Sequence, residues 1–233
     1  MPVDGEEEVR FYLLSGLFLL LFPLLSGACG EAAPSPTTLG EIALPPPQTR
    51  GGMSLTEALA QRRSVRSYTA QPLTWEEISQ LLWAAQGITD RRGFRTAPSA
   101  GALYPLEVYL VLPGGWYHYR PADHHLEVRG RGDLRRDLWM AGLSQEALLQ
   151  APAVLVIAGV VSRTAARYGD RAERYVFLEA GHAAQNLLLQ ATALGLGAVP
   201  IGAFDDEEVR RVLGLSPDET PLYLIPVGRP AVP

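Results

Sequence analysis

Residues 174–195 read RYVFLEAGHAAQNLLLQATALG, and they constrain the fold more than any other stretch of the chain. The segment predicts a helix from about Arg171 to Leu194, which Gly195 ends. Apolar residues cover nearly its whole circumference, so the helix must be buried on more than one side. In a body this small, that pattern indicates burial against a partner subunit as well as against a sheet of its own.

The strands that this helix would cover are marked by apolar runs. Residues 153–161, AVLVIAGVV, contain no polar position and predict a central strand that is covered on both faces. Turn residues separate shorter strands at 108–112, 116–119 and 126–128 into an antiparallel meander, and 222–227 supplies the last strand. Helices and strands mix without strict alternation. The expected class is α+β, with one central mixed or antiparallel sheet flanked by helices.

Capping residues mark the other helices. Ser54 and Thr74 each stand three residues before a glutamate, which is the capping-box pattern of a helix start. The second of these helices is expected to end with Gly87 as its C′ residue. A shorter helix is expected to begin at Asp205.

The charge balance excludes several functional classes. The 233 residues include 25 acidic and 20 basic side chains, and every basic residue is arginine. The formal net charge is −5, of which residues 53–233 carry only −1, so the body offers no basic surface for a nucleic-acid partner. The single cysteine, Cys29, excludes an internal disulfide and any cysteine-based zinc site, and no metal is expected.

An export signal is expected at the start of the chain. Residues 11–28 carry no charge, and small residues precede Cys29, as in a bacterial lipobox. Residues 1–29 are therefore expected to be a lipobox-like leader, cut before Cys29, so that a lipid on this thiol is the only contact with a membrane. The alternative is an uncleaved anchor helix. The acidic first residues suggest that translation begins at Val9. Separately, if the apolar segment is not part of the protein, the protein is expected to be cytoplasmic.

The remaining chain divides into a linker and a body. Residues 30–52 are expected to be a proline-rich tether, because Pro45, Pro46 and Pro47 favour an extended path, although residues 42–44 can dock on the body. Residues 53–233 are then one folded domain.

Three stretches of the body carry unusual chemistry. Arg62, Arg63, Ser64 and Arg66 form a dense set of donors that suits a phosphate, although a solvated basic turn is an equal alternative. Residues 97–105, APSAGALYP, are small and precede a strand, so backbone can approach a flat ligand there. Residues 195–204 are rich in glycine but fail the dinucleotide fingerprint, because a proline stands where the third glycine belongs.

Together these stretches resemble the nitroreductase superfamily of FMN enzymes, and in particular its SagB-type dehydrogenase branch. The likeness rests on RRSVRSY at 62–68, APSAGALYPLEVYLV at 97–111 and EAGHAAQNLLLQATALGLGAVPIGAF at 179–204. It covers nearly all of 53–233. The resemblance implies an intertwined homodimer with FMN at the interface.

The resemblance also implies roles for single residues. Arg62, Ser64 and Arg66, with Arg63 beside them, would hold the FMN phosphate and ribityl chain. Pro98, Ser99 and Ala100 would line the isoalloxazine from the partner subunit. The turn of Pro200, Ile201 and Gly202 would place a backbone N–H near flavin N5, with Gly202 in place of a glutamate common in other nitroreductases.

Catalytic roles are implied for the pair Arg167-Tyr168. SagB-type enzymes that oxidise azoline rings in peptides carry a catalytic Lys-Tyr pair at this place. Arginine stays protonated, so Arg167 cannot act as a base. Tyr168 can take a proton if a nearby arginine stabilises its phenolate, and the candidates are Arg163, Arg167 and Arg171. The alternative is that Tyr168 is an ordinary wall of the pocket.

The resulting expectation is an FMN-dependent oxidoreductase that transfers hydride between a substrate carbon and flavin N5. The substrate is a small molecule or a peptide, and an exported enzyme would pass electrons to oxygen or a quinone. Two alternatives remain open. One is an NAD(P)H-dependent nitro or quinone reductase, and the other is a non-catalytic flavin-binding subunit of a peptide-modifying complex.

Overall fold

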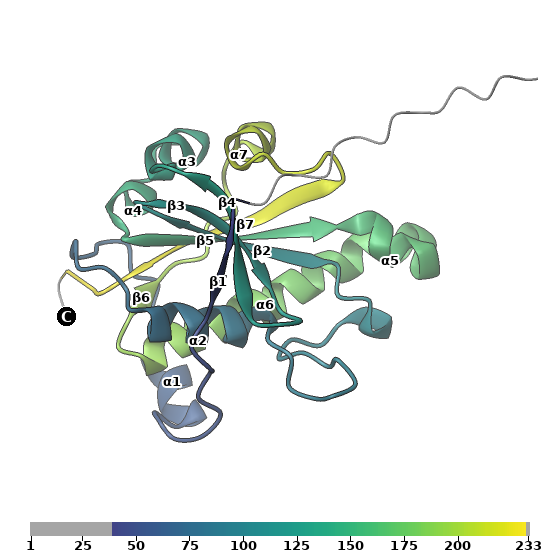
Figure 1. Cartoon of the computed structure of the whole chain (residues 1–233), viewed down its shortest axis with the longest axis horizontal. Helices are drawn as coiled ribbons and strands as arrows, with labels where there is room; N and C mark the ends of the chain where they lie inside the picture. The colour runs from purple at the N-terminus through teal and green to yellow at the C-terminus, as the bar shows by residue number, and fades with distance from the viewer. Residues whose placement is uncertain (1–38, 232–233) are drawn as a thin grey trace, which may run out of the picture. The chain divides into compact units, whose positions relative to one another are not determined.

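The computed structural model describes residues 39–231 (Figure 1). The predicted leader at 1–29 and residues 30–38 of the predicted tether lie outside the described residues. Among the helices of 39–231, none is both long enough and apolar enough to cross a membrane.

One antiparallel sheet of seven strands organises the chain, as expected. Its order is β1-β4-β3-β2-β5-β7-β6. The strands are β1 (Glu41–Ala43), β2 (Leu106–Leu112), β3 (Gly115–Arg120), β4 (His125–Arg131), β5 (Ala153–Val160), β6 (Gly197–Ala198) and β7 (Glu219–Gly228). Every residue of β5 is buried, which confirms the central strand predicted from its unbroken apolar run. β2 and β7 flank it, and β2, β3 and β4 form the predicted meander.

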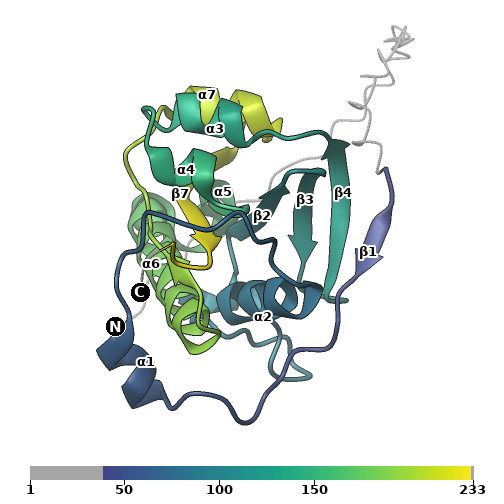
Figure 2. The ribbon, with the colours of Figure 1, turned by 90° about the vertical axis from the view of Figure 1, so that its left-hand side faces the viewer.

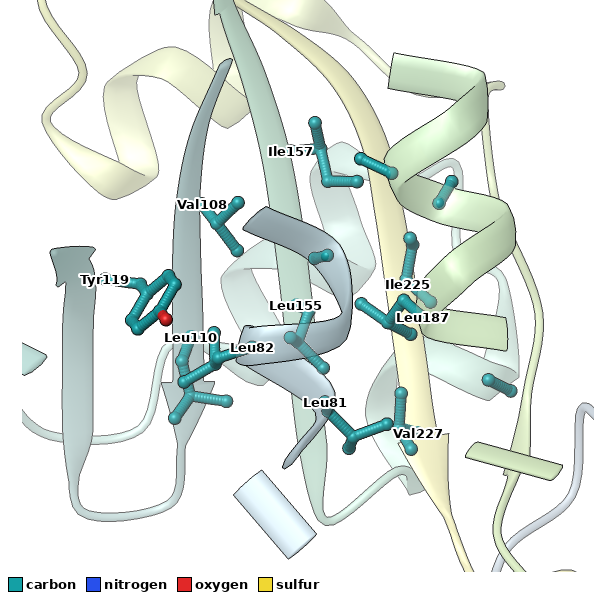
Figure 3. Close-up of a cluster of buried hydrophobic side chains, with 14 of the residues drawn as sticks. Leu81, Leu82, Val108, Leu110, Tyr119, Leu155, Ile157, Leu187, Ile225 and Val227 are labelled. Carbon is teal, nitrogen blue, oxygen red and sulfur yellow. The ribbon is translucent and has the colours of Figure 1, made fainter. Parts of the chain in front are cut away.

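Helices cover both faces of the sheet (Figure 2). α2 (Trp75–Gln86) and α6 (Ala172–Ala193) pack on one face. α3 (Arg135–Ala141), α4 (Glu146–Gln150) and α7 (Asp206–Leu213) pack on the other. α1 (Leu55–Gln61) lies beside α6, and α5 (Val161–Tyr168) follows β5 directly. Figure 3 shows the core under α2 and α6, where Leu82 and Leu187 meet β2, β5 and β7.

The predicted helix starts are confirmed. Ser54 and Thr74 cap α1 and α2 in complete capping boxes, and the Asp205 side chain accepts from Glu208 N at the start of α7. The role predicted for Gly87 is wrong. It ends α2 in an extended conformation with φ −64°, and its missing Cβ instead makes room for the Trp83 ring, which a Cβ there would approach to 2.1 Å.

α6 follows the long helix predicted from the sequence. It runs from Ala172 to Ala193, and Gly195 beyond it takes φ +71°. One side is buried on the sheet and on α2, whereas Phe177 and Leu178 are 50% and 53% exposed. Within one protomer, therefore, the helix keeps an uncovered apolar surface.

The folded body extends before the predicted boundary at residue 53, and the predicted docking of residues 42–44 on it is confirmed. Glu41–Ala43 pair with β4, and Leu44 is buried. Pro45 O accepts from Ser79 Oγ at 2.6 Å, and Gln48 N donates to Gln80 Oε1 at 2.8 Å. The prolines of this segment favour an extended path, but that path lies against the sheet edge and α2.

Candidate functional site

The arginine segment lies against the loop that contains β6. Ser64 forms a parallel bridge with Ala198, and Val65 N donates to Ala198 O at 3.1 Å. The approach is close because Gly197 has no side chain: a Cβ on it would lie 2.6 Å from Val65 Cβ. The first and third sequence motifs therefore form one unit of structure.

The guanidinium groups of this segment are not neutralised by carboxylates of the described residues. Among residues 39–231, no carboxylate forms an ion pair with Arg62, Arg63 or Arg66. Arg63 donates to the carbonyls of Ala60 and Arg62 at 3.0 and 2.7 Å, and both Ser64 and Arg66 are exposed. Three uncompensated cations within five residues are an anion-binding set, and a phosphate matches their forked geometry.

The turn after β6 presents a further backbone donor. Ile201 N donates to Leu224 O at 2.9 Å, and Pro200 carries no N–H. Gly202 is exposed, and its N–H meets no acceptor within 39–231. Beside Gly202 lies a groove of about 270 Å³, whose walls include Phe177, Phe204, Leu222 and Tyr223. A flat aromatic ring suits such a groove, because aromatic side chains stack on it and the free N–H can bond its edge.

The second motif meets the predicted catalytic pair. Pro98, Ser99 and Ala100 enter a short turn, Ala100–Ala102, and Ser99 Oγ accepts from Tyr104 N at 2.9 Å. Gly101 follows with φ +63°, a conformation that favours glycine. A Cβ on Gly101 would lie 2.9 Å from Tyr168 Oη and 3.1 Å from Arg167 Nη1.

Tyr168 ends α5 with one cation beside it. Its ring packs edge-on against Tyr175 at 5.0 Å between centroids, and the Arg167 guanidinium carbon lies 5.6 Å from its ring centre. Arg163, another of the predicted options, has its guanidinium group bonded elsewhere. It donates to Glu107 Oε1 at 2.6 Å and to Tyr104 O at 2.7 Å.

The arginine segment and the Tyr168 loop lie on opposite sides of one protomer. α1 and β6 are at one side of the molecule and α5 is at the other (Figure 1). Each side holds part of the predicted set, and neither holds all of it.

Sequence reasoning assigned no role to one buried acid. Glu179 of α6 is 3% exposed, and burial raises the pKa of its carboxyl to about 7. The only sign of it in the sequence is an acidic residue on an otherwise apolar helix. That pattern does not distinguish a functional residue from a structural one. Within the described residues, no group of three or more His, Cys, Asp or Glu side chains could hold a metal ion.

Comparisons with known proteins concern the family and the fold of the chain. The sequence pattern of the nitroreductase family matches residues 59–229. A protein of Methanocaldococcus jannaschii named as a nitroreductase is 47% identical over 76% of this chain and 91% of its own. A crystal structure of a protein from Ralstonia eutropha, also named as a nitroreductase, is 35% identical with a TM-score of 0.76, and covers 83% of this chain and 90% of its own. Trifolitoxin operon protein TfxC of Rhizobium leguminosarum bv. trifolii is 26% identical over 75% of this chain and 55% of its own.

Proposed function

The chain belongs to the nitroreductase family, and we propose that it is an FMN-dependent oxidoreductase of the SagB type, built as a homodimer. FMN, when bound, accepts or donates a hydride at N5. The protein's own part is to hold the phosphate, orient the ring, keep a donor near N5 and manage the proton on the substrate.

The uncompensated arginine cluster beside the β6 turn carries this proposal. Arg62, Arg63 and Arg66 supply forked donors without competing carboxylates in the described chain, and Ser64 adds a hydroxyl. Gly202, whose N–H meets no acceptor within 39–231, borders an aromatic-walled groove after β6. These features fit a ligand with a phosphate at one end and a flat ring at the other.

Removal of two of these arginines is expected to release the flavin. The Arg62→Ala/Arg66→Ala variant loses two charge-assisted hydrogen bonds, so its affinity for FMN should fall about 100-fold. The measurement is FMN fluorescence quenching by flavin-free protein, together with the flavin retained after desalting.

The matched control is Arg91→Ala/Arg136→Ala. Both of these arginines are exposed, and neither forms an ion pair or side-chain hydrogen bond among the described residues. Equal FMN affinity in the two double variants would contradict the proposed phosphate site.

We assign the handling of the substrate proton to Tyr168, beside whose ring Arg167 lies. Its hydroxyl lies against Gly101, at the end of the loop that would line the ring from the partner subunit.

A second candidate is a nitro or quinone reductase that uses NAD(P)H. The 47% identical relative that is named as a nitroreductase favours it. NADPH separates the two functions: rapid bleaching of the bound flavin by NADPH, with turnover of a nitroarene, supports the reductase. A yellow protein whose flavin no donor reduces would instead act as a flavin-binding subunit.

A further inference from the structure

The Ser99 loop (residues 98–104), which precedes β2, has an unusual backbone conformation. Gly101 has φ +63°, and Ala102 and Tyr104 have φ +53° and +48°. Residues other than glycine rarely adopt such left-handed values, because the Cβ then approaches the following carbonyl oxygen. Two of them within three positions indicate that surrounding contacts keep the loop in this shape.

Both ends of the Ser99 loop are fixed to the body. Ala97 before it is fully buried, and Thr96 O accepts from Asn186 Nδ2 of α6 at 3.2 Å. Pro105 O after it accepts from Val160 N at 2.8 Å. The residues between these ends keep their shape through further contacts.

Tyr104 carries several of these contacts. Its N–H donates to Ser99 Oγ at 2.9 Å, and its hydroxyl accepts from Arg95 N at 3.3 Å. The Arg95 guanidinium carbon lies 4.6 Å from the centre of its ring. Its carbonyl oxygen accepts from Arg163 Nη1 at 2.7 Å. A displacement of Tyr104 therefore affects Ser99, because a hydrogen bond joins the two residues.

Arg163 connects the Ser99 loop to α5, the helix that ends with Tyr168. Its second terminal nitrogen, Nη2, donates to Glu107 Oε1 at 2.6 Å, and the other carboxylate oxygen of Glu107 lies 2.8 Å from His118 Nε2. A guanidinium group is planar and donates in fixed directions. Because β2 and His118 hold the Glu107 carboxylate, this carboxylate orients the donor that reaches Tyr104 O.

The exposure of Arg163 argues against a mainly stabilising role. Its side chain is 39% exposed, against 18% for that of Glu107. An ion pair with one partner this exposed contributes little to the free energy of unfolding, because water screens it. The hydrogen bond to Tyr104 O nevertheless fixes the place of that carbonyl. Removal of the guanidinium group should therefore change the position of the loop more than the stability of the fold.

We propose that Arg163 is a positioning residue: it holds the Ser99 loop against α5, so that Ser99 and Tyr168 keep a fixed separation. This inference rests on the proposed function, which places Ser99 at the flavin ring and Tyr168 at the substrate proton. Glu107 acts through Arg163, which it orients. No covalent bond is made or broken, and no proton is transferred.

Hydrogen exchange of the flavin-free, full-length protein tests the hold on the loop. Arg163→Met keeps an apolar stem and removes the guanidinium group. The amides of residues 99–104 should exchange about tenfold faster in this variant, because the loop opens more often. The matched control is Arg136→Met, since Arg136 of α3 is exposed and forms no ion pair or side-chain hydrogen bond among the described residues. Equal exchange in the two variants overturns the proposal.

FMN binding tests the consequence for the ring. Arg163→Met should bind FMN about tenfold more weakly than Arg136→Met. The visible circular dichroism of FMN at saturation should also differ between them, because the ring takes another orientation. The Tm of the flavin-free protein should fall by only a few degrees. A merely structural role would lower the Tm and leave the spectrum of the saturated flavin unchanged.

Two further variants make the result specific. Arg163→Lys restores the charge with one point donor, so its loss of FMN affinity should be only about threefold. Should Arg163→Met fail to fold, this variant decides the test, and an affinity equal to that of Arg136→Met overturns the proposal. Glu107→Gln should weaken FMN binding about threefold in the parent and not at all in Arg163→Met. Additive losses would contradict an action of Glu107 through Arg163.

The outcomes separate the two proposals. A parent protein that binds no FMN overturns the proposed function, and the role of Arg163 at the ring with it. A parent that binds FMN, while Arg163→Met matches Arg136→Met in affinity and spectrum, overturns the role of Arg163 and leaves the FMN site standing.

Discussion

At the scale of single residues, glycines decide which groups meet. Gly197 allows the arginine segment to reach the β6 loop, and Gly101 allows the turn after Ser99 to reach Tyr168. The two contacts differ in kind. At Gly197 only the lack of space opposes a side chain. Gly101 also has φ +63°, so an added side chain there has both a steric and a conformational cost.

The substitution Gly101→Ala is expected to weaken FMN binding about tenfold. The new methyl group must displace Tyr168 Oη or Arg167 Nη1, and either movement shifts the loop that would line the ring. FMN fluorescence quenching is the measurement.

Gly93→Ala supplies the control for this substitution. Gly93 has φ +87°, but a Cβ there meets no atom within 4 Å. It should therefore cost about 1 kcal/mol of stability, as Gly101→Ala does through its backbone, while FMN affinity stays at the parental value. Equal affinities for the two variants would show that the contact with Tyr168 is irrelevant to the site.

At the scale of elements, the two sides of α6 have different roles. Its buried side completes the core under the sheet, and its exposed side carries Phe177 and Leu178. Phe177 also borders the groove at Gly202. A helix surface that is apolar beside a proposed ring site suits an interface between subunits, because covering it completes both the helix burial and the groove.

The substitution Leu178→Glu should therefore dissociate the proposed homodimer. A charge in the centre of an apolar interface has no partner there, and its desolvation should weaken association at least about 100-fold. Analytical ultracentrifugation at micromolar protein measures the change. Met140→Glu, a 54% exposed residue of α3 on the other face of the sheet, should leave the dimer intact.

Elements with strong local signals were predictable from the sequence. α2 and α7 have side-chain caps, α6 has a long apolar pattern, and β5 is an unbroken apolar run. α3, α4 and α5 were missed because the residues at their N-caps make no side-chain cap bond, and β1 was missed because three residues carry little periodicity.

The residues of the proposed site also divide into those that the sequence could predict and those that it could not. The arginine, Pro98–Ala100 and Pro200–Gly202 motifs could be picked out because their compositions are unusual. Their grouping could not be predicted, since contacts such as Val65 to Ala198 depend on how distant segments pack. Glu179 was unpredictable for a related reason: its burial depends on tertiary packing, and not on its neighbours in sequence.

At the scale of the whole molecule, each protomer carries two incomplete parts of the proposed site. The arginine segment lies at the α1 and β6 side, and the Ser99 loop with Tyr168 lies at the α5 side (Figure 1). A homodimer in which the arginine side of one subunit meets the α5 side of the other contains two complete sites.

Complementation between subunits tests this arrangement. Arg62→Ala/Arg66→Ala removes one part, and Ser99→Glu places a charge in the other, so neither homodimer should retain FMN. In a 1:1 mixture refolded together, half of the dimers are mixed and each has one intact site. Bound FMN should return to about a quarter of the parental amount. No recovery would mean that each site is built within one protomer.

The bridge between Ser64 and Ala198 has a thermodynamic consequence. It adds the arginine segment to the edge of the sheet beside a strand of two residues, so this edge has little hydrogen bonding of its own. A ligand that spans the arginines and the β6 turn closes that edge and binds only the folded chain. By mass action, FMN at 100 times its Kd then raises the unfolding free energy by about 2.7 kcal/mol. The cofactor would thus be a structural part of the sheet edge as well as the redox group.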